Sequence, residues 1–315
     1  MSSRPVVTVL ASADVLPGAE IRNASAALSD AQIVLMREAL ASVGRDMEVV
    51  QWDAPDVDWS RYESAITAVT WDYAARPEQF LAQLSEIAEQ TRLINSLDVI
   101  RWNLNKTYLK DLEERGAQLV PTHWVEKATP EAAEAAFAAF DADRIVIKPV
   151  VGAGAWRQVM LRKGEPWPSE AELPPAAAMI QPFLPAIQSE GEYSFLFFNG
   201  QFSHAVVKRP QKGDYRIQTS FGGSAEPYMP SADDLADARD VLESVPEELF
   251  HARVDMVRAE DGSLLLMELE LIEPYLFIED APDFIATFAA GYDDLMTDES
   301  TWAPALGEVD LDEEY

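Results

Sequence analysis

One lysine at the end of an apolar strand is the first residue whose placement suggests chemistry. The chain has only seven lysines, and Lys148 follows the apolar run 145–147 and precedes a proline. A lysine in such a position is costly to bury unless an anion meets it. The small-residue loop after it contains Gly152 and Gly154, and such loops let backbone N–H groups approach a phosphate closely. The pattern indicates an anion site; the alternative is that Lys148 only extends its charge to solvent from a strand edge.

Three carboxylates in two successive strand-like segments form a second chemical pattern. Asp255 lies two residues after Arg253, and Glu268 and Glu270 alternate with apolar residues in the next segment. Side chains two residues apart share a face of a sheet. Three carboxylates that face one another across a hairpin repel unless a divalent cation lies between them, and their oxygens suit Mg²⁺ bound together with substrate phosphates. The alternative is a solvated polar face, because so acidic a protein has many exposed carboxylates.

Composition excludes several classes of function. The 315 residues carry 24 Lys+Arg against 55 Asp+Glu, a formal net charge of −31, which repels phosphate backbones and anionic membranes. We therefore expect no nucleic-acid or membrane partner. The absence of cysteine excludes disulfides, thiolate nucleophiles and Cys-ligated metals. The start of the chain lacks the apolar region of a signal peptide, and no apolar run approaches the ~18 residues of a membrane span, so we expect a soluble cytoplasmic protein.

The first hundred residues must form the first of the elements that position these groups. Strand-like runs at 6–10, 47–50 and 65–70 alternate with helical segments, the last of which begins at Pro77. Such alternation predicts a parallel sheet covered by helices. Ligands bind outside the carboxyl ends of the strands in such sheets. The side chains expected at that edge, as candidate substrate residues, are Ser12, Asp14, Trp71, Asp72 and Tyr73.

The rest of the chain reads as one helix followed by two groups of strands. A single amphipathic helix is expected from Leu97 to Arg115. The dipeptides Asn199-Gly200 and Asp261-Gly262, each flanked by strand-like segments, predict hairpins and hence an antiparallel sheet after residue 190. From residue 291 onward the chain has nine acidic side chains and no Lys or Arg, which is typical of a partly disordered, solvated tail.

The order of these motifs resembles that of ATP-grasp ligases, most closely the prokaryotic glutathione synthetase branch. The phosphate-binding lysine and small-residue loop come first, followed by the connector 181–192, the segment 207–210, the glycine-containing loop 213–224 and the carboxylate hairpin. Together these motifs span about Leu97 to Pro274. Among small relatives with a Glu-x-Glu ending, the chain also resembles the ligases that close the D-cycloserine ring. One departure is Glu270, since the family usually has Asn at this position.

The resemblance implies an α/β fold with an α+β C-terminal part and a set of domains. These would be an N-terminal Rossmann-like domain (1–96), a connecting helix (97–116), a lid subdomain (117–183), a catalytic subdomain (184–291) and an acidic tail (292–315). ATP would lie between the lid and the C-terminal sheet.

The resemblance also implies a role for each candidate site residue. Lys106, Lys148 and the loop with Gly152 and Gly154 would hold the ATP phosphates; Ile180, Gln181, Phe183 and Leu184 would surround adenine; Glu190 or Glu192 would bind ribose. Arg209, Arg216 and Arg253 would bind the γ-phosphate and the carboxylate that attacks it, and Asp255, Glu268 and Glu270 would bind Mg²⁺, with two ions expected.

The activity that the resemblance implies is ATP-dependent ligation of a carboxylate to an amine. The carboxylate would attack the γ-phosphorus to give an acyl phosphate and ADP, and an amine would then displace phosphate to form an amide or peptide-like bond. The expected partners are small-molecule carboxylate and amine substrates, in small-molecule or specialised peptide biosynthesis; a homodimer stays open. Two alternatives stay open as well: a phosphotransferase that stops at a phosphorylated product, and a non-catalytic nucleotide-binding protein.

Overall fold

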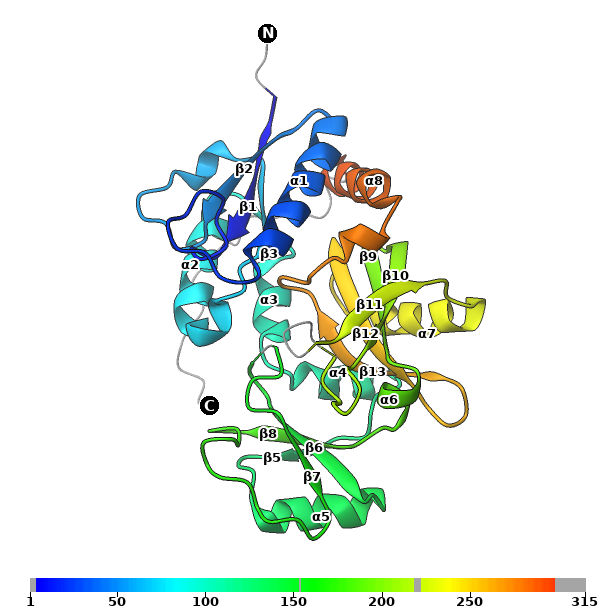
Figure 1. The fold of residues 1–315 in the computed structure, drawn as a ribbon. Coiled ribbons are helices and arrows are strands. Elements are labelled where there is room, and N and C mark those ends of the chain that lie inside the picture. The colour runs from blue at the N-terminus through cyan, green and yellow to red at the C-terminus, as the bar shows by residue number, and fades with distance from the viewer. Residues whose placement is uncertain (1–3, 153, 218–221, 298–315) are drawn as a thin grey trace.

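The computed structural model describes residues 4–152, 154–217 and 222–297. The structure contains three separate sheets, which follow one another from one end of the molecule to the other (Figure 1). The mixture of one parallel sheet and two antiparallel sheets confirms the predicted α/β fold with an antiparallel C-terminal part. No helix in the described ranges is long and apolar enough to cross a membrane.

The N-terminal sheet is parallel, as the alternation of strands and helices predicted. Its strand order is β2-β1-β3-β4, and α1 and α2 cover opposite faces because alternate residues of β1 enter different cores: Val9 packs with α1 and Leu10 with α2. The bounds are β1 (Val6–Ala11), α1 (Ala26–Ser42), β2 (Asp46–Gln51), β3 (Ser64–Val69), α2 (Pro77–Gln90) and β4 (Arg92–Ile94), with the short 3₁₀ helices η1 (Trp59–Arg61) and η2 (Tyr73–Ala75) between them.

The single helix predicted from Leu97 to Arg115 is wrong. The structure has two helices, α3 (Leu97–Asn103) and α4 (Tyr108–Glu114). Between them the Asn105 side chain accepts a hydrogen bond from the Thr107 amide, and the Lys106 amide donates to the Val150 carbonyl at 2.8 Å. Because that amide bonds outside the helix, the helix is interrupted where Lys106 meets the loop after residue 150.

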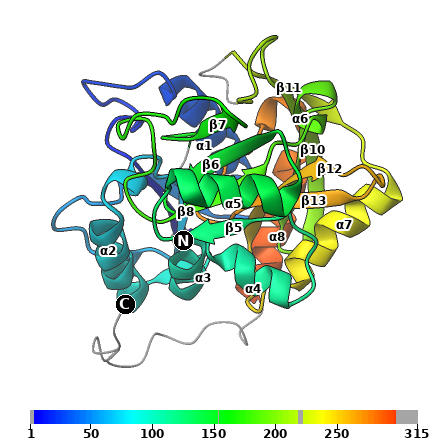
Figure 2. The same ribbon diagram turned by 90° about the horizontal axis from the view of Figure 1, so that it is seen from below.

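The second sheet is antiparallel, with strand order β5-β8-β6-β7 and one face covered by α5 (Figure 2). Its elements are β5 (His123–Val125), α5 (Pro130–Phe140), β6 (Arg144–Pro149), β7 (Val159–Arg162) and β8 (Ala178–Pro182). Thr129 caps α5 by accepting from the Ala132 amide, and Pro130 occupies its first turn. These elements fall within residues 117–183, the range predicted to form a lid subdomain.

The third sheet is five-stranded and antiparallel, with strand order β11-β10-β9-β12-β13. Both predicted hairpins are present: β9 pairs with β10 across Asn199-Gly200, and β12 pairs with β13 across Asp261-Gly262. The elements are α6 (Ala186–Ser189), β9 (Glu192–Phe198), β10 (Gln201–Arg209), β11 (Ser224–Tyr228), α7 (Ala232–Glu243), β12 (His251–Arg258), β13 (Leu264–Glu270), η4 (Ile278–Asp280) and α8 (Phe284–Thr297).

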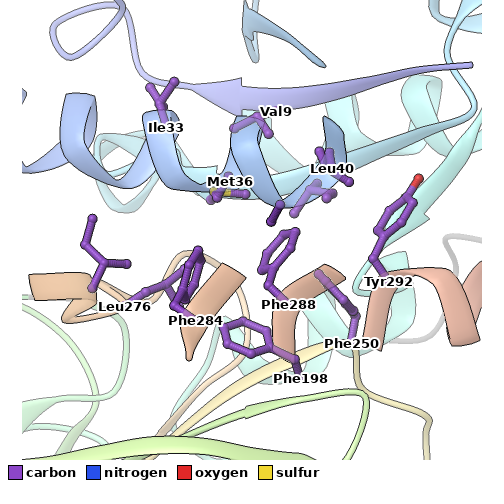
Figure 3. Packing of buried hydrophobic residues seen from close by; sticks show 14 of the residues in the cluster. Val9, Ile33, Met36, Leu40, Phe198, Phe250, Leu276, Phe284, Phe288 and Tyr292 are labelled. Carbon is purple, nitrogen blue, oxygen red and sulfur yellow. The ribbon is translucent and has the colours of Figure 1, made fainter. Parts of the chain in front are cut away.

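Helix α8 joins the N-terminal and C-terminal sheets through one aromatic core. Phe284 and Phe288 of α8 pack with Met36 of α1 on one side. On the other side they pack with Phe198 of β9 and with Phe250, which directly precedes β12 (Figure 3). The expected tail therefore does not begin at residue 292, because residues 292–297 complete α8 and buried Tyr292 belongs to this core. The remainder of the predicted tail, 298–315, lies outside the described residues.

Candidate active site

Strands β12 and β13 place four charged side chains on one face of the third sheet. Arg253 lies opposite Glu270, and Asp255 lies opposite Glu268 in the antiparallel register. This confirms the shared face that the two-residue spacing predicted. The four side chains, one guanidinium and three carboxylates, therefore form one charged patch, which we call the hairpin cluster.

Arg253 and Asp255 form the buried floor of the hairpin cluster. The Arg253 guanidinium donates to both Asp255 oxygens, from Nε at 3.0 and 3.2 Å and from Nη2 at 2.8 Å, and also to Glu270. Asp255 further accepts from the Ser194 hydroxyl. Burial alone would raise the pKa of Asp255, but Arg253 and Lys208 outweigh it and lower this pKa to about 2. Asp255 is therefore ionised, and its charge is balanced by protein cations.

Lys208 is a member of the site that the sequence reasoning missed. Its ammonium on β10 contacts Glu192 Oε1 at 2.5 Å and Asp255 Oδ1 at 3.2 Å, and all three side chains are buried. The reasoning instead chose the next residue, Arg209, which is exposed and pairs with Glu226 at 2.6 Å. Successive residues of a strand point to opposite faces, so only one of the two can enter the cluster.

Lys106 connects the hairpin cluster to the glycine loop. Its ammonium lies 2.8 Å from Glu268 Oε1 and donates to the Gly152 carbonyl at 2.7 Å. Burial raises the pKa of Glu268, but Lys106 outweighs that effect and the pKa is lowered. Gly152 (φ +149°) and Gly154 (φ +62°) both have backbone conformations that favour glycine. The helix break before α4 thus brings Lys106 to the loop predicted to bind phosphates.

Lys148 lies on the second sheet and faces the same cluster. Its ammonium donates to Gln181 Oε1 at 2.9 Å, and burial lowers its pKa although Glu268 and Glu192 oppose this. In the described part of the chain no carboxylate lies within ion-pair distance of Lys148, in contrast to Lys106 and Lys208. Its positive charge is therefore the least compensated of the three.

The residues predicted to surround adenine have different environments. Ile180 is fully buried in the core beneath α5, so its side chain is not free to cover a base. The Arg144 guanidinium carbon lies over the Phe183 ring, 3.9 Å from the ring centre. The Phe183 amide donates to the Arg144 carbonyl. Leu184 packs against the small core of Val120, Ile187 and Val257. Of the residues predicted to surround adenine, Ile180 is therefore the one whose side chain is enclosed in a core.

The structure separates the two candidates for ribose binding. Glu192 begins β9, and its carboxylate contacts Lys208, which also contacts Asp255 of the hairpin cluster. Glu190 precedes the strand and bonds instead to the Tyr193 hydroxyl at 3.0 Å and to Arg258 at 3.1 Å. Glu192 is therefore the candidate that adjoins the other site residues.

Arg216 lies in the loop after β10. Its guanidinium donates to both Asp214 oxygens, at 3.1 and 2.7 Å, and this pairing lowers the pKa of Asp214 strongly. The described hydrogen bonds of the Arg216 guanidinium are therefore those to Asp214.

Most of the candidate substrate residues of the N-terminal domain are engaged in internal bonds. The Ser12 hydroxyl donates to the Val69 carbonyl and accepts from the Asp72 amide. The Asp72 carboxylate accepts from Trp52 at 2.7 Å and from Arg76 at 2.6 Å. The Ser12 and Asp72 side chains therefore stabilise the loops at this edge of the sheet. Asp14 accepts from Asn23 at 2.7 Å, and its other oxygen is buried without a partner in the described residues.

Trp71 and Tyr73 connect this loop to the segment after β13. The Trp71 indole donates to the Glu273 carbonyl at 3.0 Å. Burial raises the pKa of Tyr73 well above its usual range, and the nearby carboxylates of Glu273, Glu270 and Glu268 raise it further. The sequence reasoning did not identify Glu273, because nothing in its spacing sets it apart. Tyr73 is the predicted substrate residue that adjoins the hairpin cluster.

The donor atoms of the cluster fit Mg²⁺ in type. Asp255, Glu268 and Glu270 offer hard oxygen ligands, and the Glu268 and Glu270 side chains are 37% and 28% exposed. Their oxygens are at present paired with Lys106, Arg253 and Lys208, and the described residues contain no group of three metal-ligating side chains already gathered around one point. Metal binding here requires the carboxylates to exchange some of these protein cations for the ion.

Comparison with known proteins places the chain in a family. The N-terminal domain model of D-cycloserine synthetase DcsG matches residues 8–95. The cycloserine biosynthesis protein DcsG of Streptomyces lavendulae is 31% identical over 268 residues, which cover 80% of this chain and 89% of that protein. The crystal structure of D-cycloserine synthetase DcsG superposes with a TM-score of 0.77 at 27% identity, over 92% of this chain and 99% of that one.

A more distant structure supports the fold alone. The ATP-grasp ligase PsnB, complexed with minimal precursor, Mg and ADP, superposes with a TM-score of 0.61 at 16% identity, over 92% of this chain and 99% of that one. The fold, the order of the lysines and the carboxylate hairpin, and the DcsG relatives agree. The chain belongs to the ATP-grasp ligases, in the family of DcsG.

Proposed function

We propose that this enzyme joins a small-molecule carboxylate to an amine at the hairpin cluster, through an acyl phosphate formed from ATP. The observation that carries the proposal is the convergence of four cationic side chains, from three parts of the fold, on the carboxylates of β12 and β13. These are Lys106 from the helix break, Lys148 from the second sheet, and Lys208 and Arg253 from the third. Such a group of cations suits a polyphosphate and a reacting carboxylate.

The proposed roles divide this site into a nucleotide side and a reacting side. Lys106, Lys148 and the glycine loop would hold the phosphates, and Glu192 would bind the ribose. Lys208 takes the role first given to Arg209, because its ammonium contacts Asp255 of the hairpin cluster. Together with Arg253 it would bind the γ-phosphoryl group and orient the incoming carboxylate. Arg216 keeps its predicted role only if its loop brings it away from Asp214.

Asp255, Glu268 and Glu270 would hold Mg²⁺, and we propose two ions. When bound, Mg²⁺ neutralises the charge that builds on the transferred phosphoryl group. The protein cations that now balance these carboxylates would then be free to contact phosphate oxygens. Glu270 differs from the others, because burial raises its pKa to about 7 even though Arg253 opposes this.

The reaction that these residues would promote proceeds in two steps. A carboxylate oxygen of the substrate attacks the γ-phosphorus, and the bond to the β-phosphate oxygen breaks to release ADP. The amine nitrogen then attacks the acyl carbon, loses its proton, and expels inorganic phosphate. Lys208 and Arg253 would hold the carboxylate in line in the first step and stabilise the phosphate that leaves in the second.

The substrates are proposed to be small. The relatives named for cycloserine biosynthesis favour a small molecule over a protein or peptide, and the carboxylate and the amine can lie on the same molecule. Tyr73 and Glu273 lie where the N-terminal domain meets the cluster, so we place the substrate between this loop and β13. The carboxyl groups of Glu270 and Glu273 near Tyr73 favour a substrate that carries an amino group.

The experiment is a measurement of ADP release with pools of amino acids and other small carboxylates and amines. The proposal predicts release that depends on Mg²⁺ and needs both a carboxylate and an amine function. Lys148→Met should lower ATP affinity without unfolding the protein, and Glu268→Gln should abolish ADP formation. The matched control is Glu226→Gln, which removes an exposed carboxylate paired with Arg209 and should leave the rate unchanged. Release that needs only one substrate and yields a stable phosphorylated product would show a phosphotransferase instead.

A further inference from the structure

We propose that Gln181 is a positioning residue that orients the Lys148 ammonium toward the nucleotide phosphates through a directed chain of hydrogen bonds from Thr122. The inference rests on the proposed function, because it assumes that Lys148 binds phosphate. It gives the Gln181 side chain a role in phosphate binding that is separate from any contact between its backbone and adenine.

The strand register places Gln181 beside Lys148. Lys148 of β6 lies opposite Met179 of β8, and Gln181 is two residues further along β8, so its side chain shares the face of Lys148. The Gln181 residue is 3% exposed, and its side chain makes two hydrogen bonds. Its oxygen accepts from Lys148 at 2.9 Å, and its nitrogen donates to the Thr122 hydroxyl at 3.0 Å.

Hydrogen-bond chemistry fixes the direction of this chain. The Thr122 hydroxyl donates its one proton to the Val120 carbonyl at 2.9 Å, so it can only accept from Gln181. The amide nitrogen must therefore face Thr122, and the amide oxygen must face Lys148. Because the lysine ammonium has donors and no acceptor, the reversed amide would leave two donors facing each other. Thr122 thus determines which end of Gln181 the lysine meets.

The neutrality of the amide is as important as its direction. Lys106 and Lys208 are each paired with carboxylates, whereas Lys148 contacts an uncharged acceptor. An amide oxygen holds the ammonium in place without neutralising it, so the charge remains for an incoming anion. A carboxylate at position 181 would hold the ammonium as an ion pair and would also repel the phosphates.

The test is a double-mutant cycle on ATP affinity, measured by calorimetry with ATP and with adenosine. Gln181→Met keeps the length of the side chain and removes both hydrogen bonds, and we expect ATP affinity to fall about fivefold. Adenosine affinity should not change, because adenosine has no phosphate. In the Lys148→Met protein, the same Gln181→Met change should have no further effect on ATP affinity, because the side chain acts through the lysine.

Two further variants separate orientation from charge. Thr122→Val removes the acceptor that orients the amide and should lower ATP affinity in the same direction by about threefold. Gln181→Glu should lower it by roughly tenfold or more, because its carboxylate pairs with Lys148. Thermal unfolding of each variant checks that the fold is retained. ATP affinity in Gln181→Glu equal to that of the unmodified protein would overturn the requirement for a neutral partner.

The outcomes distinguish failure of the inference from failure of the proposed function. Lys148→Met with unchanged ATP affinity would show that the proposed phosphate site itself is wrong. If Lys148→Met weakens ATP binding but Gln181→Met has no effect, or weakens ATP and adenosine equally, or weakens ATP as much in the Lys148→Met background, then Gln181 does not act through Lys148 and the inference is overturned.

Discussion

The carboxylate of Glu270 should destabilise the metal-free enzyme above neutral pH, so Glu270→Gln should stabilise it. Glu270 is partly buried beside Asp255 and Glu268, and although Arg253 offsets part of the cost, its pKa is raised to about 7 from a usual 4.5. A raised pKa means that the folded state binds the proton more tightly than the unfolded chain does. The free energy of unfolding therefore falls as the pH rises from the unfolded value of about 4.5 through 7.

The size of the effect follows from the shift. A difference of about 2.5 pKa units favours the neutral side chain in the folded state by about 3 kcal/mol at pH 8, and by about 1 kcal/mol at pH 5.5, where much of the group is protonated in the folded protein. Glutamine resembles the protonated carboxyl group and keeps an oxygen that can accept from Arg253. The stabilisation of Glu270→Gln should therefore grow by about 2 kcal/mol between these two pH values.

The assay is urea unfolding of both proteins in the presence of a chelator at several pH values. Glu226→Gln is the control, since this exposed carboxylate pairs with Arg209 on the surface and its loss should change stability by less than about 0.5 kcal/mol at any pH. A Glu270→Gln protein that is less stable than the unmodified protein at pH 8, or whose stability difference does not vary with pH, would refute the reasoning. It would show that the pairing with Arg253 fully compensates the buried charge.

Two further predictions concern the scaffold of the site. Gly191 has φ +116°, and a Cβ there would lie 2.4 Å from the Lys208 carbonyl oxygen. Gly191→Ala should therefore lower the free energy of unfolding in urea by about 3 kcal/mol and weaken ATP binding. Gly200→Ala, with no atom within 4 Å of its Cβ, should lower it by about 1 kcal/mol. Equal losses in the two variants would contradict this. Burial lowers the pKa of His251 to about 4, so below pH 6.5 the unfolded chain binds a proton that the folded protein does not. The free energy of unfolding therefore decreases as the pH is lowered. Between pH 7 and 5 the unmodified protein should therefore lose about 2 kcal/mol more than His251→Gln does, and parallel pH profiles would contradict this.

The sequence was sufficient where a residue's role follows from local periodicity. The two-residue repeat predicted that Asp255 shares a face with Arg253 and that Glu268 shares one with Glu270, and the register brings both pairs to the same face. The Asn199-Gly200 hairpin was also predictable, because both residues adopt the positive φ angles, 48° and 72°, that this turn requires and that these residue types tolerate. Patterns of this kind depend on neighbours in the chain and therefore need no knowledge of the fold.

The parts that the sequence did not predict depend on contacts between distant segments. The helix break before α4 arises because the Lys106 amide bonds to Val150, 44 positions away in the sequence. The choice between Lys208 and Arg209 depends on which face of β10 meets Asp255, and the family resemblance did not distinguish these two neighbours. Ser12 and Asp72 lie at the predicted edge of the sheet, but their side chains bond within the N-terminal domain.

The most direct test of the account is the fate of the substrate's carboxylate oxygen. With a carboxylate substrate labelled with ¹⁸O and the amine present, an acyl-phosphate reaction transfers one ¹⁸O from the carboxylate to the phosphate that is released. We predict singly labelled phosphate, in an amount equal to the ADP formed, detected by mass spectrometry. Unlabelled phosphate formed together with the amide would contradict the account, because the carboxylate would then not have attacked the γ-phosphorus of ATP.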